Sequence, residues 1–463
     1  MKSSELISKN EKLFEYLHSN SIEKLSGNYS PQILTLFFQE IFKFDNSEQI
    51  NNAFYQISEI VDKNPETIEL LQPDHFIFFI SSLQSNELIE ATLSLLYKIS
   101  LNIEKYVNIC SFLSELPFFH VFLDVFQNHL SPFNESILEN LLVISGNFIM
   151  QNQQLQDLAF TQGFIPFLLD FNPMIQSENT CSISMIQSYI NILSAYISHP
   201  CNHDIEIAIY HIFFQYLQIS NEEISIQILK GYKYSLQWSS SNIYPFIIYS
   251  GLIPILCEFT VHQITSLRKN SLKLLIFAGN FDHNVFQILS DFKEEEKIQA
   301  ILSLDENKSC SYALKLIKNW IKSGIAMNYL IEIIQNLDIF TLFQNKEFKV
   351  KKQFLNFLLF FIEKFEGSSA ELFNDEFVSF LMDLANSGDP KICSKILLIW
   401  RNLKNVKNQQ IDYESQIIYL AHLLQENEGF QEIINNLNEN HDGINEFRFN
   451  SLYNEFISSL SIE

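Results

Sequence analysis

The sequence predicts an all-α protein built from repeated helical units, and three observations support this. Amphipathic stretches recur along the chain at start-to-start steps of 40 to 49 residues, a period typical of two- or three-helix repeats. The 463 residues contain only 11 Gly and 11 Pro, too few turn signals for a chain of short strands. The composition is 47% hydrophobic, which is enough to bury a large core. We therefore expect a stack of helices, each covered by its neighbours.

Nine stretches with apolar residues at helical spacing define the repeat. They are residues 47–60, 87–100, 136–149, 184–197, 225–238, 268–281, 310–321, 350–363 and 391–403. In the second stretch Ile89, Leu93, Leu96 and Ile99 form one stripe of a 3.6-residue helix. Others, such as FLNFLLFFI at 354–362, are apolar nearly all round, so neighbouring helices must cover them on several sides.

Two similar phrases mark where a unit begins. They are TQGFIPFLLDF at 161–171 and YSGLIPILCEF at 249–259. Gly163 and Gly251 suit the left-handed conformation that follows the end of a helix. Pro166 and Pro254 suit the first turn of the next helix, where a missing N–H has no intrahelical partner to lose. The predicted unit is a short helix, a glycine turn, a second helix that begins near the proline, and a long third helix.

The ends of the chain are predicted to differ from the repeats. Residues 1–46 are expected to form an N-terminal helical cap, 47–403 the repeat array, and 404–463 a C-terminal cap or tail. A polar linker is expected around 436–447, because this stretch has few periodic apolar residues. A weak helix follows at 447–460. It either caps the last repeat with a polar outer face or folds back into the groove.

Residues 135–171 and 250–280 resemble the armadillo repeat, whose pattern is Gly-aliphatic-Ile-Pro-x-Leu at the second helix and a third helix that ends in Asn. The matching positions are Gly163, Pro166 and Leu168 in one unit, Gly251, Pro254 and Leu256 in the other, and Asn147 and Asn280 in the third helices. The resemblance implies an all-α, right-handed armadillo/HEAT-like α-solenoid superhelix of about nine to ten repeats. It also implies that the third helices line a concave groove. HEAT-type units remain an alternative for residues 284–403.

A more distant resemblance is to the importin-alpha class of this family, which binds basic nuclear localisation peptides. In that class the third-helix Asn holds the peptide backbone, and a Trp four residues earlier holds the lysine stems. This chain has Val143 and Ile276 at the two matching Trp positions, and residues 1–20 carry only three lysines where that class has a basic arm. A transport receptor for basic peptides is therefore kept as an alternative function.

The net charge excludes some classes of partner. The chain has a formal charge of −24 and only three arginines, Arg268, Arg401 and Arg448. Nucleic-acid binding depends on Lys and Arg that neutralise phosphates, so no nucleic-acid partner is expected. An anionic membrane surface would be repelled. A protein or basic peptide partner would be favoured through faster encounter, although acidic excess also serves solubility alone.

The sequence also predicts a compartment. The six cysteines are scattered without a CxxC pair, as expected of small buried hydrophobes in a reducing environment. Residues 1–20 contain no apolar signal region. The longest apolar runs are about half the length of a membrane span, so no membrane insertion is expected. We expect a cytoplasmic or nuclear protein, and the oligomeric state is not predicted.

One cluster has side chains that can bind a metal. HPCNHD contains His199, Cys201, His203 and Asp204, and zinc accepts all three of their donor types. No second pair of ligands has a suitable spacing, so a polar loop between helices is expected, with no metal and no cofactor. The motifs of hydrolases, nucleotide-binding loops and zinc proteases are missing, so no enzyme is predicted. The basic run KEFKVKK at 346–352 is expected to lie on the surface, where an acidic partner is an alternative reading.

Five residues are candidates for partner binding in the groove. They are Asn147, Asn280, Trp238, Trp400 and Arg268. Asn is unfavourable inside a helix and offers both a donor and an acceptor. Trp is common in binding hot spots but also fills cores. The predicted function is a non-catalytic scaffold or adaptor that binds an extended peptide or a partner helix. A nucleotide-exchange factor for a chaperone is a further alternative.

Overall fold

The computed structural model describes residues 41–44, 46–102, 107–177, 181–219, 221–238, 240–292, 294–303, 306–325, 339–365, 374–405, 411–439 and 444–460. The chain divides into two compact units, Met1–Ile243 and Tyr244–Glu463. Within the described residues nearly all regular structure is helical, apart from one isolated bridge between Leu130 and Phe133. The predicted N-terminal cap lies outside the described residues up to residue 40.

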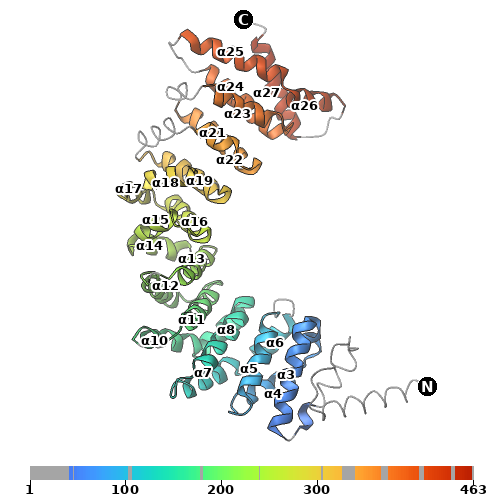
Figure 1. Ribbon diagram of the computed structural model, residues 1–463, viewed down its shortest axis with the longest axis vertical. Helices are drawn as coiled ribbons and strands as arrows, with labels where there is room; N and C mark the ends of the chain where they lie inside the picture. The colour runs from blue at the N-terminus through green and yellow to red at the C-terminus, as the bar shows by residue number, and fades with distance from the viewer. Residues whose placement is uncertain are drawn as a thin grey trace, which may run out of the picture. The chain divides into compact units, whose positions relative to one another are not determined.

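The first unit is a stack of short and long helices (Figure 1). They are η2 (Ile41–Lys43), α3 (Ser47–Lys63), η3 (Pro65–Leu70), α4 (Pro73–Ser82), α5 (Ile89–Ser100), α6 (Val107–Ser114), α7 (Phe118–Asn128), α8 (Glu135–Gln151), α9 (Gln153–Thr161), α10 (Phe164–Ser177), α11 (Ile183–Tyr196), α12 (His203–Leu217) and α13 (Glu222–Ser235).

The second unit continues the same pattern, and its first helix begins just before the boundary. The helices are α14 (Ser240–Tyr249), α15 (Leu252–Thr260), α16 (Thr265–Phe281), α17 (Asn284–Asp291), α18 (Glu294–Ser303), α19 (Asn307–Ser323), α21 (Ile339–Gln344), α22 (Phe348–Lys364), α23 (Asp375–Ala385), α24 (Pro390–Lys404), α25 (Ile411–Glu426), α26 (Glu428–Glu439) and α27 (Ile444–Leu460).

All nine predicted repeat helices are present, which confirms the all-α repeat fold. They are α3, α5, α8, α11, α13, α16, α19, α22 and α24. In the first unit these third helices pack one on the next from α3 to α13, and in the second from α16 to α24. The last, α24, also packs on α27, which therefore occupies the place of a tenth third helix.

The glycine turns have the predicted conformation. Gly163 has φ +81° between α9 and α10, and Gly251 has φ +83° between α14 and α15. Pro166 and Pro254 lie in the first turns of the helices that follow. The two phrases therefore end one helix and start the next, as their residue types predict.

Replacing Gly163 by alanine is expected to lower the free energy of unfolding by about 1 kcal/mol, because a Cβ is disfavoured at positive φ. A steric clash is not the cause, since the atom nearest to the new Cβ would be Leu123 Cδ2 at 3.8 Å. Gly163→Asn should lose less, since Asn tolerates this conformation better. Urea unfolding monitored by circular dichroism measures both. Equal losses for Ala and Asn would show that the backbone conformation is not the cause.

Several third helices begin at a side-chain cap. Asn46, Asn134 and Asn221 each accept a hydrogen bond from a backbone N–H in the first turn of α3, α8 and α13. Such caps satisfy donors that the helix itself leaves unpaired, and each is worth about 1 kcal/mol. The Asn just before the apolar stretch therefore fixes where these three long helices start.

The repeats are not all alike. In the α9–α10–α11 repeat three helices are present, whereas α12 follows α11 with only turns and extended residues at 197–202. The HPCN sequence lies in this short connection. The α12–α13 repeat therefore has two helices, as HEAT-type units do, within a stack of three-helix units.

The predicted linker around 436–447 is wrong where the structure describes it. Residues 436–439 belong to α26, and residues 444–447 begin α27. Phe430 and Ile433 bury one face of α26, and Phe449 and Phe456 bury one face of α27. These few large apolar side chains are sufficient to hold helices whose other residues are polar.

Phenylalanine dominates the interior of both units. In the first, Phe118, Phe119, Phe122 and Phe126 of α7 are all fully buried. In the second, Phe354 of α22 stacks on Phe343 with ring centroids 4.1 Å apart. Each buried ring contributes roughly 1.5–3 kcal/mol through removal of apolar surface from water. Rings also meet across consecutive repeats, since Phe119 of α7 packs on Phe164 of α10 with ring centroids 5.8 Å apart.

No described helix is by itself long and apolar enough to cross a membrane. Only α14 and α15 together meet the length and composition expected of a span, and they meet at a bend of 83°.

Candidate functional site

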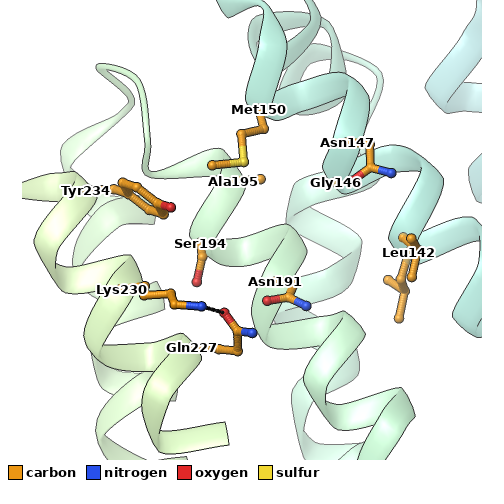
Figure 2. Close-up of a pocket in the computed structure, with 11 residues that line it drawn as sticks. Leu142, Gly146, Asn147, Met150, Asn191, Ser194, Ala195, Gln227, Lys230 and Tyr234 are labelled. Atoms are coloured by element: carbon orange, nitrogen blue, oxygen red, sulfur yellow. Dashed lines mark hydrogen bonds between the residues drawn. The ribbon is translucent and has the colours of Figure 1, made fainter. Parts of the chain in front are cut away.

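A cavity of about 190 Å³ opens on the third helices of the first unit (Figure 2). Its walls come from α8, α11 and α13 alone. The lining residues are Leu142, Val143, Gly146, Asn147, Met150, Asn191, Ser194, Ala195, Gln227, Lys230 and Tyr234. The predicted groove face is therefore hollowed at this point in the first unit.

The spacing of the helices around the cavity depends on two glycines. A Cβ on Gly146 would lie 3.4 Å from the Cα of Ile192, so α8 and α11 approach closely there. A Cβ on Gly231 would lie 2.5 Å from the Phe213 ring and 2.7 Å from Ser194 Oγ. A side chain at Gly231 would therefore displace the wall that carries Ser194.

Ser194 is the most informative polar group in the cavity. Its side chain is 6% exposed, and its Oγ has no hydrogen-bond partner among the described residues. A buried hydroxyl without a partner is unfavourable by about 1–3 kcal/mol. The Oγ atom itself is closed off from solvent, so a ligand in the cavity can bond it only when the wall moves slightly.

Polar side chains lie on both sides of the cavity (Figure 2). Asn147 Nδ2 donates to Ser100 Oγ at the end of α5 at 3.0 Å, which leaves its carbonyl oxygen as an acceptor. Asn191 is exposed and lies between the other two helices. On α13, Lys230 Nζ donates to Gln227 Oε1 at 3.4 Å. Lys230 is the only charged residue in the lining.

Asn280, the other predicted groove asparagine, lies on a third helix of the second unit. It is exposed on α16 and its Oδ1 accepts a hydrogen bond from Asn319 Nδ2 of α19 at 2.8 Å. Both predicted asparagines therefore bond a neighbouring third helix through their side chains. Their binding of a partner stays a prediction.

The prediction that Arg268 and Trp400 are groove residues is wrong, because both side chains are buried. Arg268 forms an ion pair with Glu306 and donates to the carbonyl groups of His262 and Gln263. Trp400 is 3% exposed and packs edge-on against Phe456 of α27 at 4.8 Å. Trp238 differs from both, since it is 57% exposed and lies beyond the end of α13.

The HPCNHD residues do not converge on one point. His199 Nε2 lies 3.0 Å from the carbonyl oxygen of Met150, while His203 and Asp204 are exposed in the first turn of α12. Burial, and secondarily Glu206, raises the pKa of Cys201 to about 12, so its thiol is protonated at neutral pH. No group of three or more His, Cys, Asp or Glu side chains placed to hold a metal is found among the described residues.

The basic run at 346–352 is mostly engaged within the protein. Lys351 Nζ lies 2.6 Å from Asp383, and Lys352 Nζ lies 3.1 Å from Asp389. Lys346 is buried. Lys349 is exposed at the start of α22.

Sequence reasoning missed most residues of the cavity, including Asn191 and Ser194. The argument applied to Asn147, an asparagine inside an apolar third helix, applies equally to Asn191 in ISMIQSYINILSAY. Ser194 gave no such signal, because small hydroxyl residues are common on buried helix faces. Its orphaned hydroxyl is visible only once the three helices are assembled.

No protein-family model and no curated protein matches this sequence. Solved structures do match its fold. One, a crystal structure of an engineered protein from the Northeast Structural Genomics Consortium, has a TM-score of 0.63 at 12% identity and covers 92% of this chain and 99% of its own. A second engineered protein from that consortium has a TM-score of 0.37 at 10% identity, covering 63% of this chain and 97% of its own. A designed armadillo repeat protein in complex with the peptide (KR)4 has a TM-score of 0.37 at 11% identity, covering 62% of this chain and 99% of its own.

The first of these likenesses extends over nearly the whole chain and concerns the fold alone. Together with the glycine turns, the proline-started second helices and the stacked third helices, it fixes the architecture. The chain folds as an all-α solenoid of armadillo-like repeats.

Proposed function

We propose that this protein is a non-catalytic interaction scaffold that binds an extended peptide segment or a helix of a partner protein on its third helices. The observation that carries the proposal is the cavity between α8, α11 and α13 with the orphaned Ser194 hydroxyl in its wall. A partner side chain that enters the cavity would bury apolar surface. With a small movement of the wall, it would also give this hydroxyl its missing hydrogen bond.

The lining also indicates how a peptide would be held. The Asn147 carbonyl oxygen and the Asn191 amide lie at the edge of the cavity, where a peptide backbone has both donors and acceptors to match them. Leu142, Val143 and Met150 supply the apolar part of the wall. Such a mixture of apolar wall and a few polar groups is typical of a binding site.

The charge of the lining bears on the alternative of a receptor for basic peptides. Lys230 is the only charged lining residue, and no carboxylate lines the cavity. A lysine from a partner would find no anion here and would be repelled by Lys230. The cavity in the first unit therefore favours an uncharged or acidic side chain.

The test is a selection of peptides from a random display library on the full-length chain, followed by affinity measurement of the selected peptides by fluorescence anisotropy. Asn191→Arg places a large side chain at the mouth of the cavity from an exposed position. We expect binding to weaken at least about thirtyfold, as at an interface hot spot, with an unchanged thermal unfolding curve. Gln154→Arg on α9, which is exposed and outside the third helices, is the matched control and should bind as wild type.

Ser194→Ala separates a binding role from a structural one. We expect the affinity for the same peptides to fall about fivefold through the lost hydrogen bond, while stability stays unchanged or rises because an unsatisfied hydroxyl is removed. Selected peptides that bind both Asn191→Arg and Ser194→Ala as tightly as wild type would contradict the proposal, as would a library that yields no binder.

A further inference from the structure

The third helices of the second unit have a charge opposite to that of the chain. Helices α16, α19, α22 and α24 contain three, four, four and four basic residues, half of the 30 in the chain, and Glu363 is the one acidic residue among them. These four helices therefore carry +14, and since the whole chain carries −24, the remainder carries −38. In the first unit the corresponding helices α3, α5, α8, α11 and α13 contain eight acidic and four basic residues.

Some of these lysines are held over aromatic rings. Lys273 of α16 and Lys315 of α19 lie 5.0 and 5.5 Å from the ring centre of Tyr312. Lys318 and Lys322 of α19 lie 5.0 and 5.8 Å from the ring centre of Phe360 on α22. We call these six residues the lysine–aromatic strip: Lys273, Tyr312, Lys315, Lys318, Lys322 and Phe360.

The strip crosses three consecutive third helices and remains accessible to solvent. Lys315 and Lys322 are exposed, and Lys273 and Lys318 are half-buried. A cation over a ring face is attracted by the ring quadrupole, which restricts a flexible lysine side chain without neutralising its charge. The aromatic rings therefore position four positive charges along one surface.

Two lysines of α22 have a different arrangement. Lys351 and Lys352 form ion pairs with Asp383 and Asp389. In contrast, no described carboxylate lies within ion-pair distance of Lys273, Lys315, Lys318 or Lys322. These four lysines are therefore positioned by aromatic rings and not by carboxylates, in a chain with 54 acidic residues.

The pKa of Lys318 shows that these lysine charges repel one another. Burial, and then the charge of Lys322, lowers the pKa of Lys318, while the charge of Glu363 acts in the opposite direction. An anion bound between Lys318 and Lys322 would relieve this repulsion.

We propose that the lysine–aromatic strip binds an acidic segment of a partner protein, rich in Asp or Glu. Third helices in such a stack lie about 8–10 Å apart, so the three helices span roughly 20 Å. An extended chain rises about 3.3 Å per residue, so a segment of about six residues with alternate carboxylates reaches from Lys273 to the Phe360 end. This surface belongs to the second unit and is separate from the cavity of the first.

A protein segment fits better than a nucleic acid. Bases bind single-strand proteins by stacking on open aromatic faces, and here the faces of Tyr312 and Phe360 are covered by ammonium groups. A long polyanion would also extend into the field of the remaining chain at −38, which repels phosphates. A short acidic segment meets the strip without reaching beyond it.

The experiment measures binding of labelled twelve-residue peptides to the full-length chain by fluorescence anisotropy. The probe is a peptide of alternating Glu and Ser, compared with alternating Lys and Ser, alternating Gln and Ser, and a thymidine heptanucleotide with six phosphates. We expect only the Glu peptide to bind, with an affinity about tenfold weaker at 300 mM than at 50 mM NaCl, because salt screens exposed charges.

The decisive variant combines Lys315→Glu, Lys318→Glu and Lys322→Glu, and should weaken binding of the Glu peptide at least about thirtyfold. The matched control combines Lys308→Glu, Lys349→Glu and Lys391→Glu, which makes the same charge change at exposed positions near the starts of α19, α22 and α24. The control should retain binding to within about threefold, since its sites lie at the opposite helix ends. Both variants are checked for an unchanged circular dichroism spectrum.

Several results would overturn the proposal. Equal weakening in both triple variants would mean that only net charge matters. Tighter binding of the oligonucleotide than of the Glu peptide would assign the strip to nucleic acid instead. No binding of the Glu peptide at 50 mM NaCl would remove the strip as a site for acidic segments. The Asn191→Arg variant should bind the Glu peptide normally, so failure here is distinguishable from failure of the cavity in the first unit.

Discussion

Replacing Arg268 by methionine is expected to lower the free energy of unfolding by about 3 kcal/mol, at the lower end of the range for breaking a buried ion pair. The Arg268 guanidinium bonds Glu306 through Nε at 3.1 Å and through Nη2. It also donates from Nη1 to the carbonyl oxygens of His262 and Gln263 at 2.5 and 2.9 Å. Methionine fills a similar volume but removes the donor of two carbonyl groups and the cation paired with Glu306, whose Oε2 keeps the hydrogen bond from Ser309 Oγ at 2.8 Å.

The position of this network explains why the effect should be large. Glu306 immediately precedes α19, and His262 and Gln263 precede α16, so one side chain ties together the starts of two third helices. The Arg268 and Glu306 side chains are 9% and 20% exposed, which limits the water that can replace the lost bonds. An exposed pair would contribute only about 0–1 kcal/mol.

Urea unfolding of the full-length chain, followed by circular dichroism, measures the effect. Arg268→Lys keeps the charge but loses the planar fork, and should fall between wild type and Arg268→Met. Combining Arg268→Met with Glu306→Gln should recover part of the loss, because the uncompensated charge is then removed. A loss below about 1 kcal/mol for Arg268→Met would place the pair among surface salt bridges.

Arg268 also shows where sequence reasoning reaches its limit. Arg268 is one of the predicted groove residues, and charged side chains are in general seldom buried. Its burial depends on Glu306, which lies 38 residues later in the sequence. Trp400 is a similar case, since its environment depends on Phe456 of α27, 56 residues later in the sequence. Local patterns do not reveal such distant partners.

The periodic features, in contrast, could be predicted. Apolar spacing located all nine third helices, and the Gly–Pro phrases located helix ends, because both depend on residues adjacent in sequence or one turn away. The cavity was only partly predictable. Asn147 was found from its residue type. The burial of the Ser194 hydroxyl, in contrast, depends on the close approach of α13 at Gly231.

The charge of the chain shows the same difference between what an average over the sequence tells and what the positions of the residues tell. The value of −24 pointed to a basic partner, but averages over a chain hide how charges are distributed among helices. A count of charges restricted to the predicted third helices is sufficient to locate the basic surface of the second unit, because apolar spacing places those helices correctly.

Trp320→Ala is expected to destabilise the second unit by about 3–5 kcal/mol, the range for truncating a large buried aromatic residue. Trp320 is fully buried in α19 and stacks on Phe286 of α17 with ring centroids 5.9 Å apart. Its indole Nε1 has no hydrogen-bond partner among the described residues, so its contribution comes from packing. Trp320→Phe therefore keeps an aromatic ring, removes an unsatisfied donor, and should lose less than about 1.5 kcal/mol. The same urea unfolding experiment compares the two variants. Similar losses for Ala and Phe would mean that an aromatic ring stacked on Phe286 is not what stabilises this position.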